Sequence, residues 1–222
     1  MHQIADLTVA GSSPAERTCW WGRLAGLERW FRKPVYASIV GSNPTPTAFF
    51  MNITILELPV ERWQEYKDLR LTLLKTYPQA YSSTYEENVQ RTDDEWKQYL
   101  QDNLDDKTIL LFAEVDGKVV GSVRAFFYDN PKEKHKASVF AMGVLPEFQG
   151  QGVGKKLLST ILEKIKSHPG MIKIDLDVTT TQTSAIHLYE SLGFKKVGEY
   201  HKELFVDGTY YNLYEMELLL DE

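Results

Sequence analysis

The sequence is poor in cysteine and in long apolar runs, and each shortage excludes a class of protein. Its 222 residues include one cysteine, Cys19, so neither an internal disulfide nor a cysteine-rich metal site can form within the chain. No run of about 18 apolar residues is present, which argues against a membrane-spanning helix and a membrane partner. No basic segment followed by an apolar stretch opens the chain, so we expect no secretory signal and a cytoplasmic location.

Basic charge is also scarce. The chain has 25 Lys and Arg against 31 Asp and Glu, a formal net charge of −6. A general nucleic-acid binder would show a basic face, so we expect no nucleic-acid partner. The acidic surplus suits a cationic substrate, although solvated surface charge explains it more simply. The five histidines show no metal-ligand spacing, and we expect no metal site.

Residues 1–50 differ from the rest of the chain. Hydrophobic periodicity is poor there, and a Gly-Ser pair recurs after 30 residues, at Gly11-Ser12 and Gly41-Ser42. A Gly-Ser-Asn-Pro stretch can be encoded by the T-arm sequence of many tRNA genes. We therefore expect residues 1–50 to be an upstream over-extension of the reading frame, with Met51 as the true start and residues 51–222 as the domain. A genuine irregular extension is the alternative, and mass spectrometry of the natural N-terminus would decide.

Apolar periodicity along residues 52–222 predicts alternating strands and helices. Strands are expected at 52–58, on both sides of Asp116-Gly117, at 136–144, at 171–178 and on both sides of Asp207-Gly208. Helices are expected within 60–78, 92–104, 151–166 and 184–194. The one clear crossover, through 151–166, predicts a parallel strand pair. The chain should form an α/β domain with a mixed, mostly antiparallel central sheet and helices on both faces.

A glycine-rich loop, Gln149-Gly150-Gln151-Gly152-Val153-Gly154, lies between the strand at 136–144 and the following helix. Such a loop at a helix N-terminus binds anions, because the first N–H groups lack partners and the helix dipole is positive there. A plain tight turn is the alternative. The loop fits neither the P-loop pattern G-x-x-x-x-G-K-[ST] nor the dinucleotide pattern G-x-G-x-x-G, which disfavours a nucleotide-dependent phosphotransferase.

The loop does match Q-x-x-G-x-G, and it resembles the acetyl-CoA loop of the GNAT superfamily of N-acetyltransferases. Downstream, residues 185–200 (AIHLYESLGFKKVGEY) resemble the family's A-x-x-L-Y-x-x-x-G-F signature in order and spacing. The resemblance covers nearly all of residues 52–220 and implies that residues 51–222 are an N-acetyltransferase domain of GNAT fold. It implies acetyl-CoA as co-substrate and direct transfer of the acetyl group to a primary amine of a small molecule or peptide.

The resemblance also implies where the co-substrate binds. The backbone of Met142, Gly143 and Val144 would bond the pantetheine arm in the manner of an added strand, where two strands splay at a bulge. A plain bulge is the alternative explanation of Gly143. The pyrophosphate would lie on the glycine loop and the helix start, that is on Gln149, Gly150, Gln151, Gly152, Val153, Gly154 and Lys155. Lys155 and Lys156 equally suit a solvated helix face. Gln182 stands where many members carry an Asn that contacts the pantetheine.

Acetyl transfer requires a proton acceptor for the amine, a donor to the oxyanion and an acid for the leaving thiolate. Tyr189, the tyrosine of the L-Y motif, is the implied acid, although its position also suits a packed aromatic. The Val144 N–H is the implied oxyanion donor. Some members use a Glu on the fourth strand as base, but residues 138–144 contain none. A water relay, Glu86 or Glu87 are the alternatives.

Residues 60–106 should form the acceptor wall. Their tyrosines and acidic residues include Tyr77, Tyr81, Tyr85, Glu86, Glu87, Asp93, Asp94, Glu95, Asp102, Asp105 and Asp106. Acidic and aromatic side chains together suit a cationic amine, while a capped and solvated helix is the simpler explanation. A non-catalytic acyl-CoA-binding regulatory module is the alternative function. The resemblance also makes a homodimer an expected state.

Overall fold

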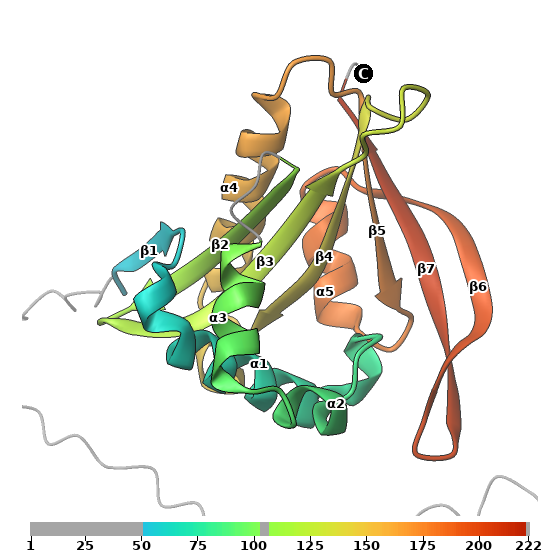
Figure 1. Ribbon diagram of the computed structural model, residues 1–222. Helices are drawn as coiled ribbons and strands as arrows, with labels where there is room; N and C mark the ends of the chain where they lie inside the picture. The colour runs from blue at the N-terminus through green and yellow to red at the C-terminus, as the bar shows by residue number, and fades with distance from the viewer. Residues whose placement is uncertain (1–50, 103–106, 221–222) are drawn as a thin grey trace, which may run out of the picture. The chain divides into compact units, whose positions relative to one another are not determined.

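The computed structural model of the protein describes residues 51–102 and 107–220, so the predicted N-terminal extension lies outside the described residues. One seven-stranded sheet, in the order β1-β2-β3-β4-β5-β7-β6, organises these residues (Figure 1). Its strands are β1 (Ile53–Leu56), β2 (Thr108–Val115), β3 (Lys118–Phe127), β4 (Lys136–Val144), β5 (Lys173–Thr179), β6 (Lys195–Val206) and β7 (Thr209–Leu219). The helices are α1 (Trp63–Thr76), α2 (Tyr85–Val89), α3 (Asp93–Gln101), α4 (Val153–Lys166) and α5 (Thr183–Ser191).

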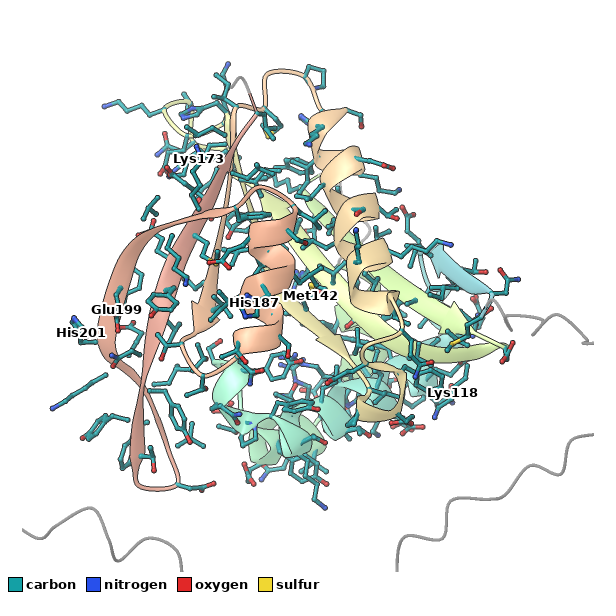
Figure 2. All side chains as sticks on the ribbon, turned by 180° about the vertical axis from the view of Figure 1, so that it is seen from behind. Lys118, Met142, Lys173, His187, Glu199 and His201 are labelled. Atoms are coloured by element: carbon teal, nitrogen blue, oxygen red, sulfur yellow. The ribbon has the colours of Figure 1, made fainter. Side chains whose placement is uncertain are left out.

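Helices cover both faces of the sheet, as predicted. α1, α2 and α3 lie on the face seen from the front in Figure 1, and α4 and α5 lie on the face seen in Figure 2. All six apolar positions expected for α4 are buried, namely Val153, Leu157, Leu158, Ile161, Leu162 and Ile165. Burying each such aliphatic side chain contributes about 1.5–3 kcal/mol. Among the described residues, no helix is long and apolar enough to cross a membrane.

Both predicted tight hairpins are present, because their turn residues tolerate left-handed backbone. Asp116 and Gly117 have φ values of +51° and +79°, and Asp207 and Gly208 have φ values of +49° and +80°. Two consecutive positive φ values are the mark of a type I′ turn, whose twist matches that of the flanking strands. The antiparallel pairs β2–β3 and β6–β7 follow from these turns.

The sequence analysis did not predict α2, a helix of five residues. The Glu87 N–H donates to the Thr84 hydroxyl, and the Thr84 N–H donates to the Glu87 carboxylate. This capping box stabilises a helix too short to show periodicity. The Thr84-x-x-Glu87 spacing was the available signal, and the same device, with Thr92 and Glu95, begins α3 as expected.

β4 and β5 form the predicted parallel pair but separate halfway along (Figure 1). They are paired only over Lys136–Ser138 and Lys173–Asp175. Beyond that point β4 bulges, since its register against β3 shifts and Ala141 takes a φ of +50°. The divergence leaves the outer backbone edge of β4 open up to Val144.

Candidate active site

Two cavities lie beside the diverging part of β4, and both are lined by Ala80 and Tyr81. The first has a volume of about 610 Å³ and lies between β4, the glycine loop and α5; we call it the loop cavity. The second, of about 380 Å³, is lined by residues of α1, the α2–α3 segment, β4 and β5, including Arg70 and Arg91; we call it the arginine cavity. Because Tyr81 borders both, the cavities are adjacent parts of one site.

Most residues that the sequence analysis assigned to co-substrate binding line the loop cavity. They are Met142, Gly143, Val144, Gln149, Gly150, Gly152, Gly154, Lys155 and Gln182, together with the expected acid, Tyr189. Two assigned residues lie elsewhere. Val153 is buried in the core, and the Gln151 side chain donates to the Glu147 carbonyl at 2.7 Å. The structure therefore brings together residues that are up to 47 positions apart, such as Met142 and Tyr189.

The N-terminus of α4, which opens into this cavity, has no cap. Gly152 is the residue before the helix, at a φ of +86°, and neither a side-chain cap nor an acidic residue serves the first turn. The Lys156 N–H makes the first bond back, to the Gly152 carbonyl at 3.0 Å, so the three preceding N–H groups lack intrahelical partners. α3, in contrast, starts with a capping box and three acidic residues. The start of α4 is thus open to an anion.

The loop glycines serve different purposes. Gly150 and Gly152 have positive φ, and a Cβ added to either would meet no atom within 4 Å, so open space faces them. A Cβ on Gly154 would lie 3.3 Å from Leu188 and 3.4 Å from Met142, in the contact between α4 and α5. On Gly143 it would collide with the Tyr81 hydroxyl and with Leu73. The space beside Gly143 is thus filled by protein, a reason that neither explanation from the sequence contained.

Polar side chains fix the loop to the strand. Gln149 Nε2 donates to the Val144 carbonyl at 2.9 Å and to Tyr77 Oη at 3.0 Å, so this side chain anchors the loop. Lys155 lines the cavity. Lys156 instead donates its ammonium hydrogen to the Ile53 carbonyl and lines neither cavity. The structure therefore separates two lysines that the sequence could not distinguish.

The open edge of β4 presents backbone groups to the loop cavity. The Leu145 N–H donates to the Val120 carbonyl of β3 at 2.8 Å. Because successive residues of a strand direct their backbone groups to opposite sides, the Val144 N–H points away from β3. Tyr81 Oη donates to the Met142 carbonyl on that same open side, at 3.3 Å. The Tyr81 hydroxyl and the Val144 N–H thus lie along the same open edge of β4.

Tyr189 lines the loop cavity and Tyr81 borders both cavities, and the two hydroxyls stay protonated. Tyr189 is 8% exposed, and its hydroxyl lies 3.9 Å from the Met142 sulfur, which sits between α4 and α5 (Figure 2). Burial raises the pKa of Tyr189 far above its usual value, and the nearby Tyr81 adds to the shift. Burial also raises the pKa of Tyr81 to about 12, although the charge of Arg70 opposes the shift. Both hydroxyls are therefore protonated at neutral pH, and the Tyr81 hydrogen is bonded to the Met142 carbonyl.

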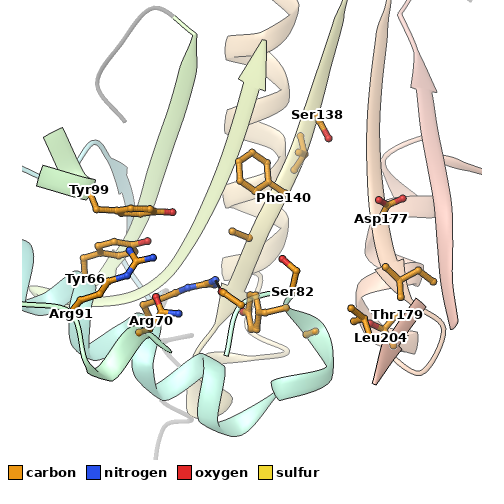
Figure 3. A pocket seen from close by; sticks show the side chains of 17 residues that line it. Tyr66, Arg70, Ser82, Arg91, Tyr99, Ser138, Phe140, Asp177, Thr179 and Leu204 are labelled. Atoms are coloured by element: carbon orange, nitrogen blue, oxygen red, sulfur yellow. Dashed lines mark hydrogen bonds between the residues drawn. The ribbon is translucent and has the colours of Figure 1, made fainter. Parts of the chain in front are cut away.

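The arginine cavity differs from the acidic acceptor wall that the sequence predicted. Figure 3 shows Arg70 and Arg91 on one side, next to Tyr66 and Tyr99. The six described acids of the expected wall line neither cavity; they are Glu86, Glu87, Asp93, Asp94, Glu95 and Asp102. Asp105 and Asp106 lie outside the described residues. Five of these acids lie in the first turns of α2 and α3, where the helix dipole favours them, and Asp102 at the end of α3 accepts from Gln98. The predicted region 60–106 does line the arginine cavity, but the six described acids are not part of that lining.

The candidate bases Glu86 and Glu87 lie outside both cavities. The carboxylate that lines the arginine cavity is that of Asp177. Asp177, on β5, is the one carboxylate among the described residues that line the arginine cavity, and it stands opposite the arginines (Figure 3). Partial loss of hydration raises the pKa of Asp177, and the charges of Glu215, Asp175 and Glu203 raise it further. The alternation along β5 indicated that Asp177 lies on the face of the strand opposite the core. It did not show which residues lie across from that face.

No metal centre is found in the described part of the chain, where no three His, Cys, Asp or Glu side chains gather closely enough to hold an ion.

Comparison with known proteins identifies the fold more closely. Residues 68–194, more than half of the chain, match the acetyltransferase (GNAT) family. N-acetyltransferase 8B of Homo sapiens is 41% identical over 88 residues, which are 39% of this chain and 38% of that protein. The Mus musculus protein of the same name is 35% identical over 94 residues, 42% of this chain and 40% of that one. The matches thus span about two fifths of the length of these curated relatives.

Solved structures share the whole described fold. An acetyltransferase of the GNAT family from Streptococcus pneumoniae superposes with a TM-score of 0.66 at 21% identity, covering 76% of this chain and 99% of that one. A putative acetyltransferase from Salmonella typhimurium, solved with its cofactor acetyl-CoA, also gives 0.66, at 20% identity, covering 77% and 95%. These similarities confirm the predicted fold.

Proposed function

This chain belongs to the acetyltransferase (GNAT) family, and we propose that it transfers the acetyl group of acetyl-CoA to a primary amine. One observation carries the proposal: the uncapped N-terminus of α4 opens into the loop cavity beside the unpaired edge of β4. A pyrophosphate and an extended amide chain need these two features together. The fold that this chain shares with the acetyl-CoA complex from Salmonella typhimurium supports the choice of co-substrate.

The residues present fit acetyl-CoA. The free N–H groups at the start of α4, the open space beside Gly150 and Gly152, and the Lys155 ammonium would hold the pyrophosphate. The outward N–H of Met142 and the outward carbonyl of Val144 would bind the pantetheine amides. The Gln182 side chain lines the cavity without a hydrogen bond to any described residue, and its amide is the further proposed partner of the pantetheine.

Acetyl-CoA would supply an activated thioester carbonyl, and the protein's own groups would manage the charges and protons. The Val144 N–H would stabilise the oxyanion, because it points into the cavity from a fixed strand. The amine nitrogen forms the new C–N bond as the C–S bond breaks. We propose that the amine gives its proton to Asp177, directly or through water, and that Tyr189 protonates the leaving thiolate. Direct attack requires no covalent enzyme intermediate.

A non-catalytic acyl-CoA-binding module is the second candidate function. It is favoured by the absence of a glutamate on β4 and by Gln182 in place of the expected Asn. Calorimetric titration of the full chain with acetyl-CoA, CoA and ATP tests the common premise. Binding of acetyl-CoA without ATP supports the assignment of the loop cavity, and no binding of acetyl-CoA would overturn both functions.

Thiol release then separates the two functions. The chain is incubated with acetyl-CoA and a panel of amines that includes amino acids, polyamines and peptides with free N-termini. Release of CoA that depends on the amine supports the transferase. Binding of acetyl-CoA with no release above the background hydrolysis for any amine would favour the binding module.

Two wider expectations remain proposals. Association of two copies is supported by the edge strand β6 and its hairpin, where Phe205 and Tyr210 are 61% and 59% exposed and pack against each other. Light scattering after size-exclusion chromatography measures the mass that tests it. The cytoplasmic location is tested by cell fractionation.

A further inference from the structure

We infer that the acceptor amine also carries a carboxylate, as a free α-amino acid does, and that Arg70 and Arg91 bind this carboxylate in the arginine cavity. The inference rests on the proposed function, because it names the substrate class of the same site. It replaces the simple cationic amine that the acidic sequence suggested. A cavity of about 380 Å³ is near the small end of ligand sites, which are roughly 300–1,000 Å³.

The first support is that both guanidinium groups lack a carboxylate partner among residues 51–102 and 107–220. Arg62, which lies just before α1, shows the usual arrangement: it pairs with Glu65 at 2.6 Å and with Glu114 at 2.7 Å. Arg70 instead donates to the Ser83 hydroxyl at 2.8 Å, and no described acid lies within ion-pairing distance of Arg70 or Arg91. Partly buried arginines with unused donors are suited to bind a planar carboxylate through two parallel hydrogen bonds.

The second support is that aromatic rings hold these guanidinium groups in place. Arg70 lies 4.4 Å from the ring centre of Tyr81, and Arg91 lies 5.1 Å from that of Tyr99. Stacking occupies the face of a guanidinium and leaves its edge, which carries the N–H donors, directed elsewhere. Less side-chain freedom is then lost when a carboxylate binds.

A third arginine lies behind this wall, against Tyr99, without lining the cavity itself. Arg124 on β3 donates to Tyr99 Oη at 2.8 Å, and its buried Nε has no hydrogen-bond partner. No described carboxylate pairs with it. A partly desolvated group of three cations is costly to the free protein, and an anionic substrate group would offset that cost.

The fourth support is the distance from the carboxylate site to the reacting carbonyl. A single ring, Tyr81, connects them: its face contacts Arg70, and its hydroxyl bonds to the Met142 carbonyl at the proposed transfer point. An amine and a carboxylate bound on the two sides of one ring are separated by few bonds. Asp177, on the opposite wall, provides the anion that attracts the ammonium group. The cavity therefore complements a zwitterion.

The test compares acceptors that differ only in the carboxylate. For several side chains, kcat/KM is measured for the free amino acid, for its amide and for its decarboxylated amine, with a dipeptide as a fourth acceptor. We expect the free amino acid to be preferred by about tenfold or more, as charge-assisted bidentate bonds predict. The amide has the less basic amine, so ionisation of the amine cannot produce this preference. Equal or better rates with the amides or decarboxylated amines would overturn the inference, and a preference for the dipeptides would show a peptide substrate instead.

Variants locate the carboxylate site. Arg70→Gln and Arg91→Gln should abolish the preference mainly through KM, while the KM for acetyl-CoA stays within about twofold because both residues lie outside the loop cavity. Arg62→Gln is the matched control, since it removes the same charge outside both cavities and should keep the preference. Retention of the preference in Arg70→Gln and Arg91→Gln would contradict the assignment.

A binding measurement tests the carboxylate site independently of catalysis, in case the proposed transferase activity is absent. If no amine is acetylated, binding of the amino acid and of its amide is measured calorimetrically on the full chain saturated with CoA. Tighter binding of the amino acid, lost in Arg70→Gln, would support the carboxylate site although catalysis is absent. Equal binding or none would overturn the inference itself.

Discussion

The loop cavity and the arginine cavity share a wall, yet the chain builds them in different ways. The loop cavity is formed mainly by two short segments, residues 142–155 and 181–189, and the groups proposed to bind the anion are the backbone N–H groups at the start of α4. The arginine cavity takes side chains from seven helices and strands, from Tyr66 on α1 to Leu213 on β7, and also from the segment 80–83 and the turn at Arg91. Backbone recognition needs glycines at fixed spacing, whereas side-chain recognition needs only that distant residues meet.

The charge inside the arginine cavity also differs from the net charge of the chain. The chain carries a formal net charge of −6, but two arginines and one aspartate line the arginine cavity. Five of the acids near residues 86–102 lie in the first turns of α2 and α3, and Asp102 accepts from Gln98 at the end of α3, so none of the six lines a cavity. Net charge therefore constrains long-range encounter with a substrate, and it does not determine the sign of charge in a pocket.

The largest expected effect on catalysis comes from substitution of Tyr189, whose hydroxyl lies beside the Met142 sulfur. Tyr189→Phe should lower kcat by about 10²–10⁴-fold, as loss of a general acid does, while the dissociation constant of acetyl-CoA stays unchanged. Amine-dependent thiol release and calorimetry measure the two quantities. Tyr85→Phe is the control, because Tyr85 packs near Lys75 outside both cavities. A kcat that survives Tyr189→Phe would leave Tyr189 as a packed aromatic and make another group the acid.

The second-largest effect should change use of the amine and leave acetyl-CoA binding unaltered, because Asp177 lines only the arginine cavity. Asp177→Asn should lower kcat/KM for the amine by about 10²-fold and remove the acidic limb of the pH–rate profile, with acetyl-CoA affinity unchanged. The folded-state pKa of Asp177 is raised, so its ionised form destabilises the fold above that pKa and its protonation relieves the cost. The variant should therefore unfold at a slightly higher temperature at neutral pH.

Asp175→Asn is the matched control for this prediction. Asp175 is on the same strand and lines neither cavity, but its charge raises the pKa of Asp177. Activity should persist, with the acidic limb moved to lower pH. An equal loss of rate in both variants would argue that strand β5 is perturbed as a whole and that Asp177 is not the base.

A smaller effect is expected from the glycine before α4. Gly152→Ala places a side chain at a φ of +86°, which costs about 1–2 kcal/mol, and it turns the N–H groups that face the anion. Affinity for acetyl-CoA should fall by about tenfold, measured calorimetrically. Gly208→Ala is the control, because its φ of +80° imposes the same strain in the β6–β7 hairpin, and Gly208 lines neither cavity. The two variants should lose similar stability, and equal affinities for acetyl-CoA would contradict the anion site.

The smallest effect distinguishes two adjacent lysines. Lys155→Met should weaken acetyl-CoA binding by about two- to fivefold, less so at high salt, because exposed charge pairs contribute about 0.2–1 kcal/mol. Lys156→Met should not change the affinity, since that ammonium group bonds to Ile53 and lies outside the loop cavity. Equal effects of both substitutions would indicate nonspecific attraction to the helix.

The sequence predicted the elements well wherever periodicity or turn chemistry was strong. The six buried positions of α4, the bounds of β4 and the two Asp-Gly hairpins are set by local patterns that burial and backbone sterics enforce. α2 escaped prediction because five residues held by a capping box have too little periodicity. Most of the loop cavity could be named in advance because its residues lie on two motifs.

The arginine cavity could not be named in advance, because nothing in the chain marks Arg70, Arg91 and Asp177 as neighbours. Arg70 comes from a helix with a regular apolar face, and Asp177 from a regular alternating strand. Arginine is also common on solvated helix surfaces, where it binds no ligand. Only the missing acidic partners and the tyrosine rings beside them distinguish Arg70 and Arg91 from such surface arginines.

The sequence by itself determined the fold class, the glycine loop and the family, because each depends on spacing along a few neighbouring residues. Only the tertiary structure decided which of two lysines faces the loop cavity, why position 143 is a glycine and which charges surround the proposed acceptor. Those outcomes depend on where β4 and β5 separate and on which side chains then meet across the opening. Packing of the whole sheet sets that divergence, and no short segment encodes it.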